Sequence, residues 1–547
     1  MSLFLKLIVT IIIFAIPFSF AATEPWAFSM LQGLVAIGWV AVLFSRKPIV
    51  YPSLFKAVTG VFGVLIGVAA IQCFFPQTLL DAVPYHPITL MRLYTLEHLS
   101  LFVTYLALVL LVIQVYPSLD EVKQLVWTLV LAAGAVEICA LLFPHGEYIS
   151  FLTGVKTGIE SVGPFLNRNH GGMFLAMNAL LSVGLFFTHQ LQYRQVITRE
   201  QKRNLTIQQI CLGLLSLGLV IAAVYSRSRG TMLSLLIGLF GYAFLCLWAI
   251  PNQLRKQVKG FFYTLLLLIA SVGWIYTHLE AIGEFAHRKN AASSQVRTML
   301  YRGAEHLLQQ YPVWGIGVGA MPVVINEYTE YDIHQYIERL HNDWLEIVLG
   351  IGYGGAAMLL VPFVWFILGT LRRLKQLELR KQFLFAALLS VLLCMGVGSL
   401  VDFHFFIPGC SVVFFIVLGM CNALTFHTGH IHRFHLGLPV LLLVALLSAG
   451  YIPLQKTRCW RISVFGKGLK TEAKLTDYEM GLSYYPSPRQ AARLATAYYT
   501  AASRDKDPIV KLYYFERSLE IAQTYLEQYP KEKELSRIYV AAQRKLQ

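Results

Sequence analysis

Charged residues are scarce in this sequence. Only 14% of its 547 residues are Asp, Glu, Lys or Arg, whereas hydrophobic residues make up 56%. A soluble globular domain carries about 25% charged residues. The shortage therefore excludes a soluble globular protein and predicts a chain embedded in a membrane.

Cysteine is also rare, and no two of the eight cysteines form a CxxC pair. Neither a disulfide framework nor a cysteine-based metal site is indicated. Cys459 alone lies outside the long apolar runs. The cysteines inside those runs are Cys73, Cys139, Cys211, Cys246, Cys394, Cys410 and Cys421.

Long apolar runs are what the chain has in abundance. A helix needs about 20 residues, at about 1.5 Å per residue, to cross roughly 30 Å of hydrocarbon. About thirteen runs approach or exceed this length, so we expect an all-α protein, a polytopic membrane helical bundle of about 12–13 spans. The predicted spans are 3–20, 26–45, 54–74, 94–116, 121–143, 169–188, 208–225, 231–250, 260–278, 343–369, 382–401, 405–425 and 434–453.

Basic residues cluster in alternate loops, at 46–56, 194–203, 255–259 and 372–381. Short loops rich in Lys and Arg stay in the cytoplasm. These loops also explain most of the +15 net charge without a nucleic-acid partner. Cleavage of residues 1–22 as a signal peptide would leave the orientation unchanged. The segments expected to face outward are 21–25, 75–93, 144–168, 226–230, 279–342, 402–404 and the C-terminal tail.

Composition divides the chain near residue 453. Residues 1–453 form the predicted membrane-embedded domain, in which 279–342 is the longest outward loop. Residues 454–547 are rich in Lys, Glu, Arg, Tyr and Ala, and we expect a separate soluble helical tail. Its helical patterns at 491–498 and 513–525, with a third helix at 532–545, fit a degenerate tetratricopeptide pair or a plain helical hairpin equally well.

An arginine pair joins two spans in the pentad Ser226-Arg227-Ser228-Arg229-Gly230. Arginine presents a planar fork of donors that binds phosphate bidentately, and a cation beside hydrocarbon is costly. The topology rule predicts few basic residues on the outward side. Two arginines in one outward turn therefore favour a bound lipid-linked phosphate or diphosphate over side chains that only reach lipid headgroups.

Polar residues also mark the start of the span 169–188, where Asn167, Arg168, Asn169 and His170 follow Gly-Pro-Phe-Leu. We expect a helix start lined with hydrogen-bond donors at this place. For Arg168 alone, an anion contact and a headgroup contact are equally good interpretations.

The long outward loop contains a second basic segment. Residues 294–311 carry apolar side chains at helical spacing, with Arg297 among them, which is typical of a helix that lies on the membrane surface. Pro312 ends this pattern, and the glycine-rich segment up to Gly319 predicts a tightly turned backbone.

His341, Asn342 and Asp343 stand at the start of the span 343–369. A histidine with an ordinary pKa of about 6.5 can accept a proton near neutral pH, so His341 is a candidate general base. A structural histidine bonded to backbone is the alternative. The glycines at 352, 354 and 355 predict that another helix approaches closely and holds the histidine in a packed site.

Asp402-Phe403-His404 joins two further spans on the outward face. Its carboxylate could orient a catalytic arginine or histidine. We interpret it as a simple polar turn.

Four of these segments together resemble the O-antigen ligase and polymerase superfamily of bacterial envelopes. In the ligases, a recurring pattern is His, then Asn, Ser or Gln, nine residues, Gly, two residues, and Gly, Thr or Tyr. His341, Asn342, Gly352 and Gly355 satisfy this pattern. The four segments are 163–170, 226–230, 311–319 and 341–342.

The resemblance implies a membrane glycosyltransferase of the GT-C type, surrounded by lipids of the bacterial inner membrane, with its active site and C-terminus in the periplasm. The donor would be a glycan linked to polyprenyl diphosphate, and no cofactor, nucleotide sugar or metal is implied. The catalytic residues would be His341, Arg229 and Arg227. The substrate-binding residues would be Arg297, Asn167, Arg168, Asn169, His170, Asn342 and Asp343.

The resemblance leaves the acceptor open, and a glycan, lipid or protein hydroxyl would fit. An O-antigen ligase is the expected function, and a repeat-unit polymerase or a protein O-oligosaccharyltransferase of the same superfamily is the alternative. From another class, a lipid-linked sugar transporter or flippase would place polar sites at mid-membrane, often in two repeated halves. We see neither feature in the sequence.

The tail 454–547 is a candidate binding site for an envelope-assembly protein. This is a hypothesis that rests on its resemblance to helical repeats. Deletion of the tail without loss of activity or complex formation would count against it.

Overall fold

The computed structural model shows an all-α protein, with no β-strand among the residues it describes. The predicted fold class is confirmed. The described residues are 2–45, 54–74, 86–143, 147, 161–195, 198–249, 259–260, 284–325, 328, 337–425, 437–465, 471–528 and 533–547.

Ten of the described helices are long and apolar enough to cross a membrane, and two shorter apolar helices accompany them. They correspond to twelve predicted spans, while the span predicted at 260–278 lies outside the described residues except for Gly260. The chain is a multi-pass membrane protein. The ten helices are α2 (Pro25–Ser45), α3 (Phe55–Phe74), α4 (Arg92–Val115), α5 (Leu119–Leu142), α7 (Arg168–Gln195), α8 (Arg199–Tyr225), α9 (Arg229–Ala249), α13 (Asp343–Gln376), α14 (Leu379–Gly398) and α16 (Gly437–Phe465), and the shorter two are α1 (Ser2–Phe18) and α15 (Pro408–Leu424).

Helix α7 is the centre of the bundle. It packs against α5, α8, α9, α14 and α15. Of the residues in an apolar stretch of 18 along this helix, 94% are buried. A helix that is apolar on all sides is stable in such a position because protein surrounds it. The first turn of α7 is therefore held in the middle of one end of the bundle.

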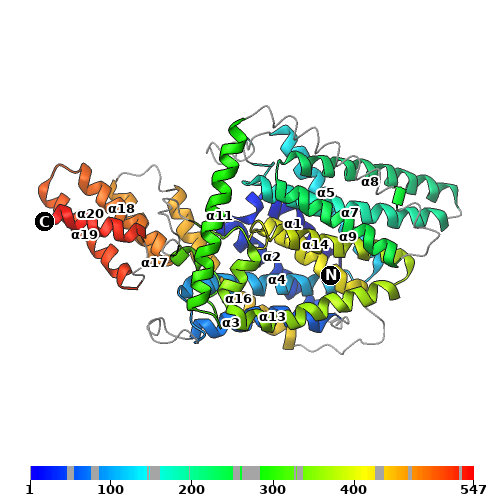
Figure 1. The fold of residues 1–547 in the computed structure, drawn as a ribbon, viewed down its shortest axis with the longest axis horizontal. Coiled ribbons are helices and arrows are strands. Elements are labelled where there is room, and N and C mark those ends of the chain that lie inside the picture. The colour runs from blue at the N-terminus through cyan, green and yellow to red at the C-terminus, as the bar shows by residue number, and fades with distance from the viewer. Residues whose placement is uncertain are drawn as a thin grey trace.

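The predicted outward segments gather at this same end, which we call the site end. In Figure 1, α11 (Glu284–Gln310) crosses beyond one end of α7, α8 and α9, and the tail helices lie still further out. This common side agrees with the predicted alternation of loops, and its assignment to the periplasm remains a prediction. Contacts across the site end join Ala21 to Gly409, Gly172 to Ser226, Asp343 to Ser399 and Glu97 to Lys456.

A second, smaller core lies at the site end. Leu300, Ala304 and Leu307 of α11 are buried against the short helix α12 (Met321–Val324) and the start of α13. The helix predicted at 294–311 is therefore present. Its apolar face packs on protein, which differs from the prediction that it rests on lipid.

Helix α13 is interrupted at Gly352, whose φ of +68° is not helical. A loop backbone fills the interruption, because Tyr353 N donates to Pro312 O (2.7 Å) and Gly354 N donates to Val313 O (2.9 Å). A Cβ atom at Gly352 would collide with Val313 O. The prediction that another helix packs on these glycines is wrong, because a loop occupies the space that a side chain would need.

The tail consists of α17 (Thr471–Tyr484), α18 (Pro488–Arg504), α19 (Pro508–Gln528) and α20 (Lys533–Leu546). Each helix contributes to one core, which contains Leu475, Leu494, Phe515 and Leu535. The last three helices correspond to the predicted patterns, whereas α17 was not predicted. The tetratricopeptide pair and the plain helical hairpin both remain predictions for the tail.

Candidate functional site

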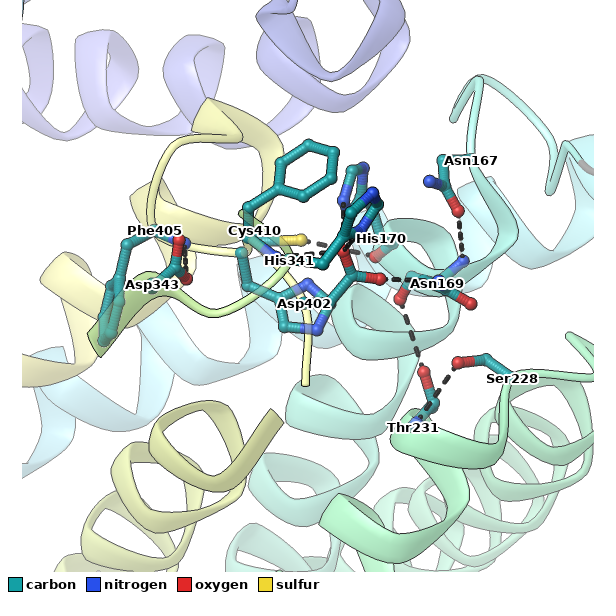
Figure 2. Close-up of polar contacts among 12 residues, drawn as sticks. Asn167, Asn169, His170, Ser228, Thr231, His341, Asp343, Asp402, Phe405 and Cys410 are labelled. Atoms are coloured by element: carbon teal, nitrogen blue, oxygen red, sulfur yellow. Dashed lines mark hydrogen bonds and ion pairs between the residues drawn. The ribbon is translucent and has the colours of Figure 1, made fainter. Parts of the chain in front are cut away.

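Asp402 is the centre of the polar groups at the site end. It follows α14, is only 3% exposed, and its carboxylate accepts three hydrogen bonds (Figure 2). The donors are Nδ1 of His341 (3.1 Å), Nδ2 of Asn169 (2.5 Å) and the backbone N–H of Phe403 (3.0 Å). A buried carboxylate is stable only when it is satisfied in this way.

His341 stands directly before α13 in an unusual backbone conformation, with φ of +56°. A non-glycine residue in this region is strained, and such strain concentrates at functional sites. Tyr301 on α11 donates from its hydroxyl to His341 O (3.1 Å) and so fixes this backbone. The side chain is 35% exposed, and its Nε2 atom makes no hydrogen bond to a described residue. A substrate can therefore reach Nε2.

The electrostatics favour an ionised Asp402. Burial alone would raise its pKa, but the hydrogen bond from His341, together with the attraction of the neighbouring histidines when they are protonated, holds the pKa below its ordinary value. Burial lowers the pKa of His404, only partly opposed by Asp402. At neutral pH the site therefore contains a carboxylate beside a neutral His404 ring.

The first turn of α7 is built around Asn167 and Asn169. Asn167 Oδ1 accepts from the N–H of Asn169 (2.9 Å), which satisfies a donor at the helix start. His170 is buried, its Nε2 lies 4.0 Å from Asp402 Oδ1, and this nitrogen has no hydrogen-bond partner among the residues that the structure describes. Cys410 Sγ donates to His170 O (3.3 Å) and ties α15 to the same turn. Arg168, the first residue of α7, is half-buried.

The arginine turn, residues 226–230, lies next to this helix start. Ser228 Oγ accepts from the N–H of Thr231 (3.2 Å) and caps α9, while Thr231 Oγ1 donates to Asn169 O (3.3 Å) (Figure 2). Arg227 and Arg229 are both exposed, and Arg227 has φ of +59°. The buried serine and threonine contacts thus anchor the turn, and its guanidinium groups remain accessible.

Arg297 approaches the site from α11. It is half-buried and stands one helical turn before Tyr301, on the same face. Burial raises the pKa of Tyr301, while Arg297 and a hydrogen bond with Asn342 act in the opposite direction. Arg297 therefore lies near the tyrosine that holds His341.

Asn342 and Asp343 contact the protein. Asn342 Oδ1 accepts from the N–H of Leu345 (3.0 Å) and caps α13. Asp343 is fully buried and Oδ2 accepts from the N–H of Phe405 (2.8 Å). Asn342 therefore caps α13, and Asp343 holds the start of α13 against the 399–407 loop. Their contact with substrate remains a prediction.

Sequence reasoning missed the position of Asp402. The Asp-Phe-His segment was visible, but nothing in the local pattern shows that it meets His341 and Asn169. Tyr301 was also missed, because a tyrosine at helical spacing is indistinguishable from a core residue. The interpretation of 402–404 as a simple polar turn does not describe a carboxylate that joins two other segments.

Among the described residues, no group of three or more His, Cys, Asp or Glu side chains has a geometry that could bind a metal ion. The site joins an aspartate-held imidazole, through Asn169 and Thr231, to a turn that carries two exposed arginines. This arrangement can take a proton from a hydroxyl and bind an anionic group.

Comparison with known families places the site in a defined context. Residues 214–360 match the O-Antigen ligase family model, a range that includes the arginine turn, α11 and His341. The match confirms the resemblance to the O-antigen ligase and polymerase superfamily and supports glycan transfer of that general type. Asp402 and the start of α7 lie outside the matched range. No curated protein matches the chain.

Proposed function

We propose that this protein transfers an oligo- or polysaccharide from a polyprenyl-diphosphate carrier to an acceptor hydroxyl at the periplasmic face of the inner membrane. The O-Antigen ligase match supports the general reaction. The observation that carries the specific proposal is the His341–Asp402 pair, which is linked through Asn169 to the arginine turn.

The start of α9 suits the diphosphate of the carrier. The N–H groups and macrodipole of a helix N-terminus favour an anion, and a cation at this position is unfavourable unless an anion offsets it. Helix α9 begins with Arg229 and has no acidic residue in its first turn. We assign the diphosphate to Arg227 and Arg229, with Arg297 as the third cation.

The reaction is a single displacement at the anomeric carbon. The acceptor oxygen forms the new glycosidic bond while the bond from the anomeric carbon to the diphosphate oxygen breaks, and its electron pair leaves with the diphosphate. The acceptor proton passes to Nε2 of His341. The arginines stabilise the charge that grows on the leaving group, and one displacement inverts the anomeric configuration.

Asp402 acts as a positioning residue for His341. Its carboxylate accepts the Nδ1 proton, which presents Nε2 to the acceptor, and it stabilises the imidazolium formed by proton transfer. The strained backbone of His341 and the Tyr301 bond fix the same orientation. His341 would contact the acceptor, whereas Asp402 acts through it.

The acceptor distinguishes the members of this superfamily. Ligation, repeat-unit polymerisation and protein O-glycosylation use the same displacement, and we favour the ligase-like reaction. A lipid-linked sugar transporter would need polar groups near the bilayer midplane. The groups described above lie at the starts of α7, α9 and α13, which favours chemistry at an interface.

The test uses purified full-length protein in nanodiscs with a radiolabelled polyprenyl-diphosphate-linked glycan and candidate acceptors. H341A and R229A should reduce transfer about 10²-fold or more. The matched controls are H306A, an exposed histidine of α11, and R199A, an exposed arginine at the opposite end of α8. Full transfer by H341A and R229A would reject the assignment.

A further inference from the structure

A large cleft lies between the tail and the site end. Its volume is about 1730 Å³, above the roughly 300–1,000 Å³ of a pocket for one small molecule. Asn167, His170 and Phe403 line it on the membrane side, and α17 and α18 line it on the tail side. The cleft therefore extends from the candidate site to the tail.

Specific contacts hold the tail in this position. Glu97 at the start of α4 accepts from Lys456 Nζ (2.8 Å) and from the hydroxyl of Tyr485. Arg489 on α18 pairs with Glu338 (2.7 Å). Because Tyr485 and Arg489 both belong to the tail, these bonds attach it at two places, to Glu97 of α4 and to Glu338.

The arginine turn is separate from the cleft. The described lining residues of the cleft include Asn167 and His170 but none of the arginine turn. The arginine turn contacts Asn169 through Thr231. His341 and Asp402 are not among the described lining residues, but the ring of Phe403, which lines the cleft, lies 5.0 Å from the ring of His341 between centroids. The cleft and the arginine turn therefore adjoin the His341–Asp402 pair through different residues.

The lining of the cleft suits sugars. Six acidic and six basic residues line it, so neither a polyanion nor a polycation is favoured by charge. Hydroxyl groups both donate and accept hydrogen bonds, and carboxylates and guanidinium groups together satisfy them. Trp460, Tyr478 and Phe403 add aromatic surface for the apolar faces of sugar rings.

Helix α18 presents a row of groups along the cleft. Arg493 and Arg504 are exposed, and neither has an ion-pair partner among the described residues. They are eleven positions apart, which places them on nearly the same face and about 16 Å apart along the helix. The small side chains of Thr496, Ala497 and Thr500 lie between them, which leaves room for an extended chain.

We propose that this cleft binds the acceptor, and that the acceptor is a glycan chain several sugars long. Its terminal hydroxyl would reach His341 past Asn167 and Phe403, while Arg493 and Arg504 would hold sugars further from the reacting end. This inference rests on the proposed function and assigns the tail the selection of long acceptors.

The test measures transfer as a function of acceptor length. Full-length protein in nanodiscs receives the lipid-linked glycan as donor, and acceptors are the same glycan released by mild acid and separated by number of sugars. In R493A/R504A, KM for long acceptors should rise about tenfold or more, since each lost charge-assisted bond is worth roughly a factor of ten. KM for acceptors of one or two sugars should not change.

The matched control is K511A/R544A, which removes two exposed basic residues from α19 and α20 that do not line the cleft among the described residues. Its KM values should equal those of the wild type. An unchanged KM for long acceptors in R493A/R504A, or an equal rise at every length, would overturn the inference. If KM of R493A/R504A rose only for a serine-containing peptide acceptor, the acceptor bound in the cleft would be a polypeptide and not a glycan.

Calorimetry separates this inference from the proposed function. The released glycan should bind wild-type protein without donor, and R493A/R504A should weaken binding of long fractions about tenfold or more. Binding that depends on these arginines without any transfer would reject the proposed function and support the cleft. Transfer by a protein whose binding of long fractions is unaffected by R493A/R504A would support the proposed function and reject the cleft.

Discussion

The carboxylate of Asp402 and the imidazole of His341 are 61 residues apart in the sequence, yet Oδ1 and Nδ1 lie 3.1 Å from each other. The chain leaves the site end along α13 and returns along α14. Asp343 N donates to Ser399 O (2.8 Å) and closes this hairpin at the site. The pair therefore depends on the packing of two spans and on the loop that follows them.

Replacing Asp402 by Asn should lower kcat by about 10²- to 10⁴-fold, because the uncharged amide cannot stabilise the imidazolium. KM for the donor should change little, since Asp402 does not contact the diphosphate in the proposed arrangement. Initial rates with radiolabelled donor give both constants. A D402N variant with wild-type kcat and an unchanged melting temperature would remove Asp402 from the mechanism.

Replacing both Arg227 and Arg229 by Lys should keep the positive charge but lose the planar fork. We expect an intermediate loss of kcat/KM, smaller than the loss of about 10²- to 10³-fold expected for either arginine replaced by Ala. Rates measured for the three variants side by side check this order. Equal rates in the Lys and Ala variants would show that charge at this turn plays no part.

Much of the fold could be predicted because it depends on local properties. Apolar length predicted the spans, and basic loops predicted which segments share one end of the bundle. The site was predictable at His341 and at Asn169, where polar residues begin an apolar span. The role of Asp402 could not be predicted, because it depends on a long-range contact with His341. The local sequence around Asp402 resembles that of any polar turn.

The glycine at 352 provides a test of the interrupted helix. Its positive φ and the nearby Val313 carbonyl leave no room for Cβ, so G352A should destabilise the protein by about 2–4 kcal/mol. The control is G63A in α3, where no atom lies within 4 Å of the added Cβ; it should be neutral or stabilising by up to about 1 kcal/mol. Thermal unfolding in detergent measures both. Equal melting temperatures of G352A and G63A would contradict the loop contact.

The contact between the 312–319 loop and the interruption of α13 could not be predicted from the sequence. Glycines near one another in a span usually indicate helix packing, and the sequence contains no signal that distinguishes a helix partner from a loop partner. The pairing between 312–313 and 353–354 joins segments about 40 residues apart. Only the assembled fold brings them together.

Stability should depend on pH through His404. Its folded-state pKa is lowered from 6.5, so the unfolded state binds the extra proton, and stability is lost as pH falls below 6.5 toward the folded-state pKa. H404Q should therefore flatten the decline between pH 7 and 5, by at most about 1.4 kcal/mol per pH unit. Chemical unfolding across this range measures it, and an unchanged slope would contradict a buried neutral ring.

Asp402 contributes in a separate pH window. Its folded-state pKa is below the ordinary 3.8, so its stabilisation is present above about pH 4 and is lost as pH falls further. The H404Q variant should retain this acid loss, whereas D402N should lack it. The two variants together separate the carboxylate from the imidazole.

The most direct test of the central claim is a reconstitution in liposomes that measures bond formation and lipid movement at once. Purified protein, polyprenyl-diphosphate-linked glycan and acceptor are combined without ATP or divalent cations. We expect a new glycosidic bond of inverted anomeric configuration and one released polyprenyl diphosphate per bond. Movement of the lipid-linked glycan across the bilayer with no new glycosidic bond would contradict the account.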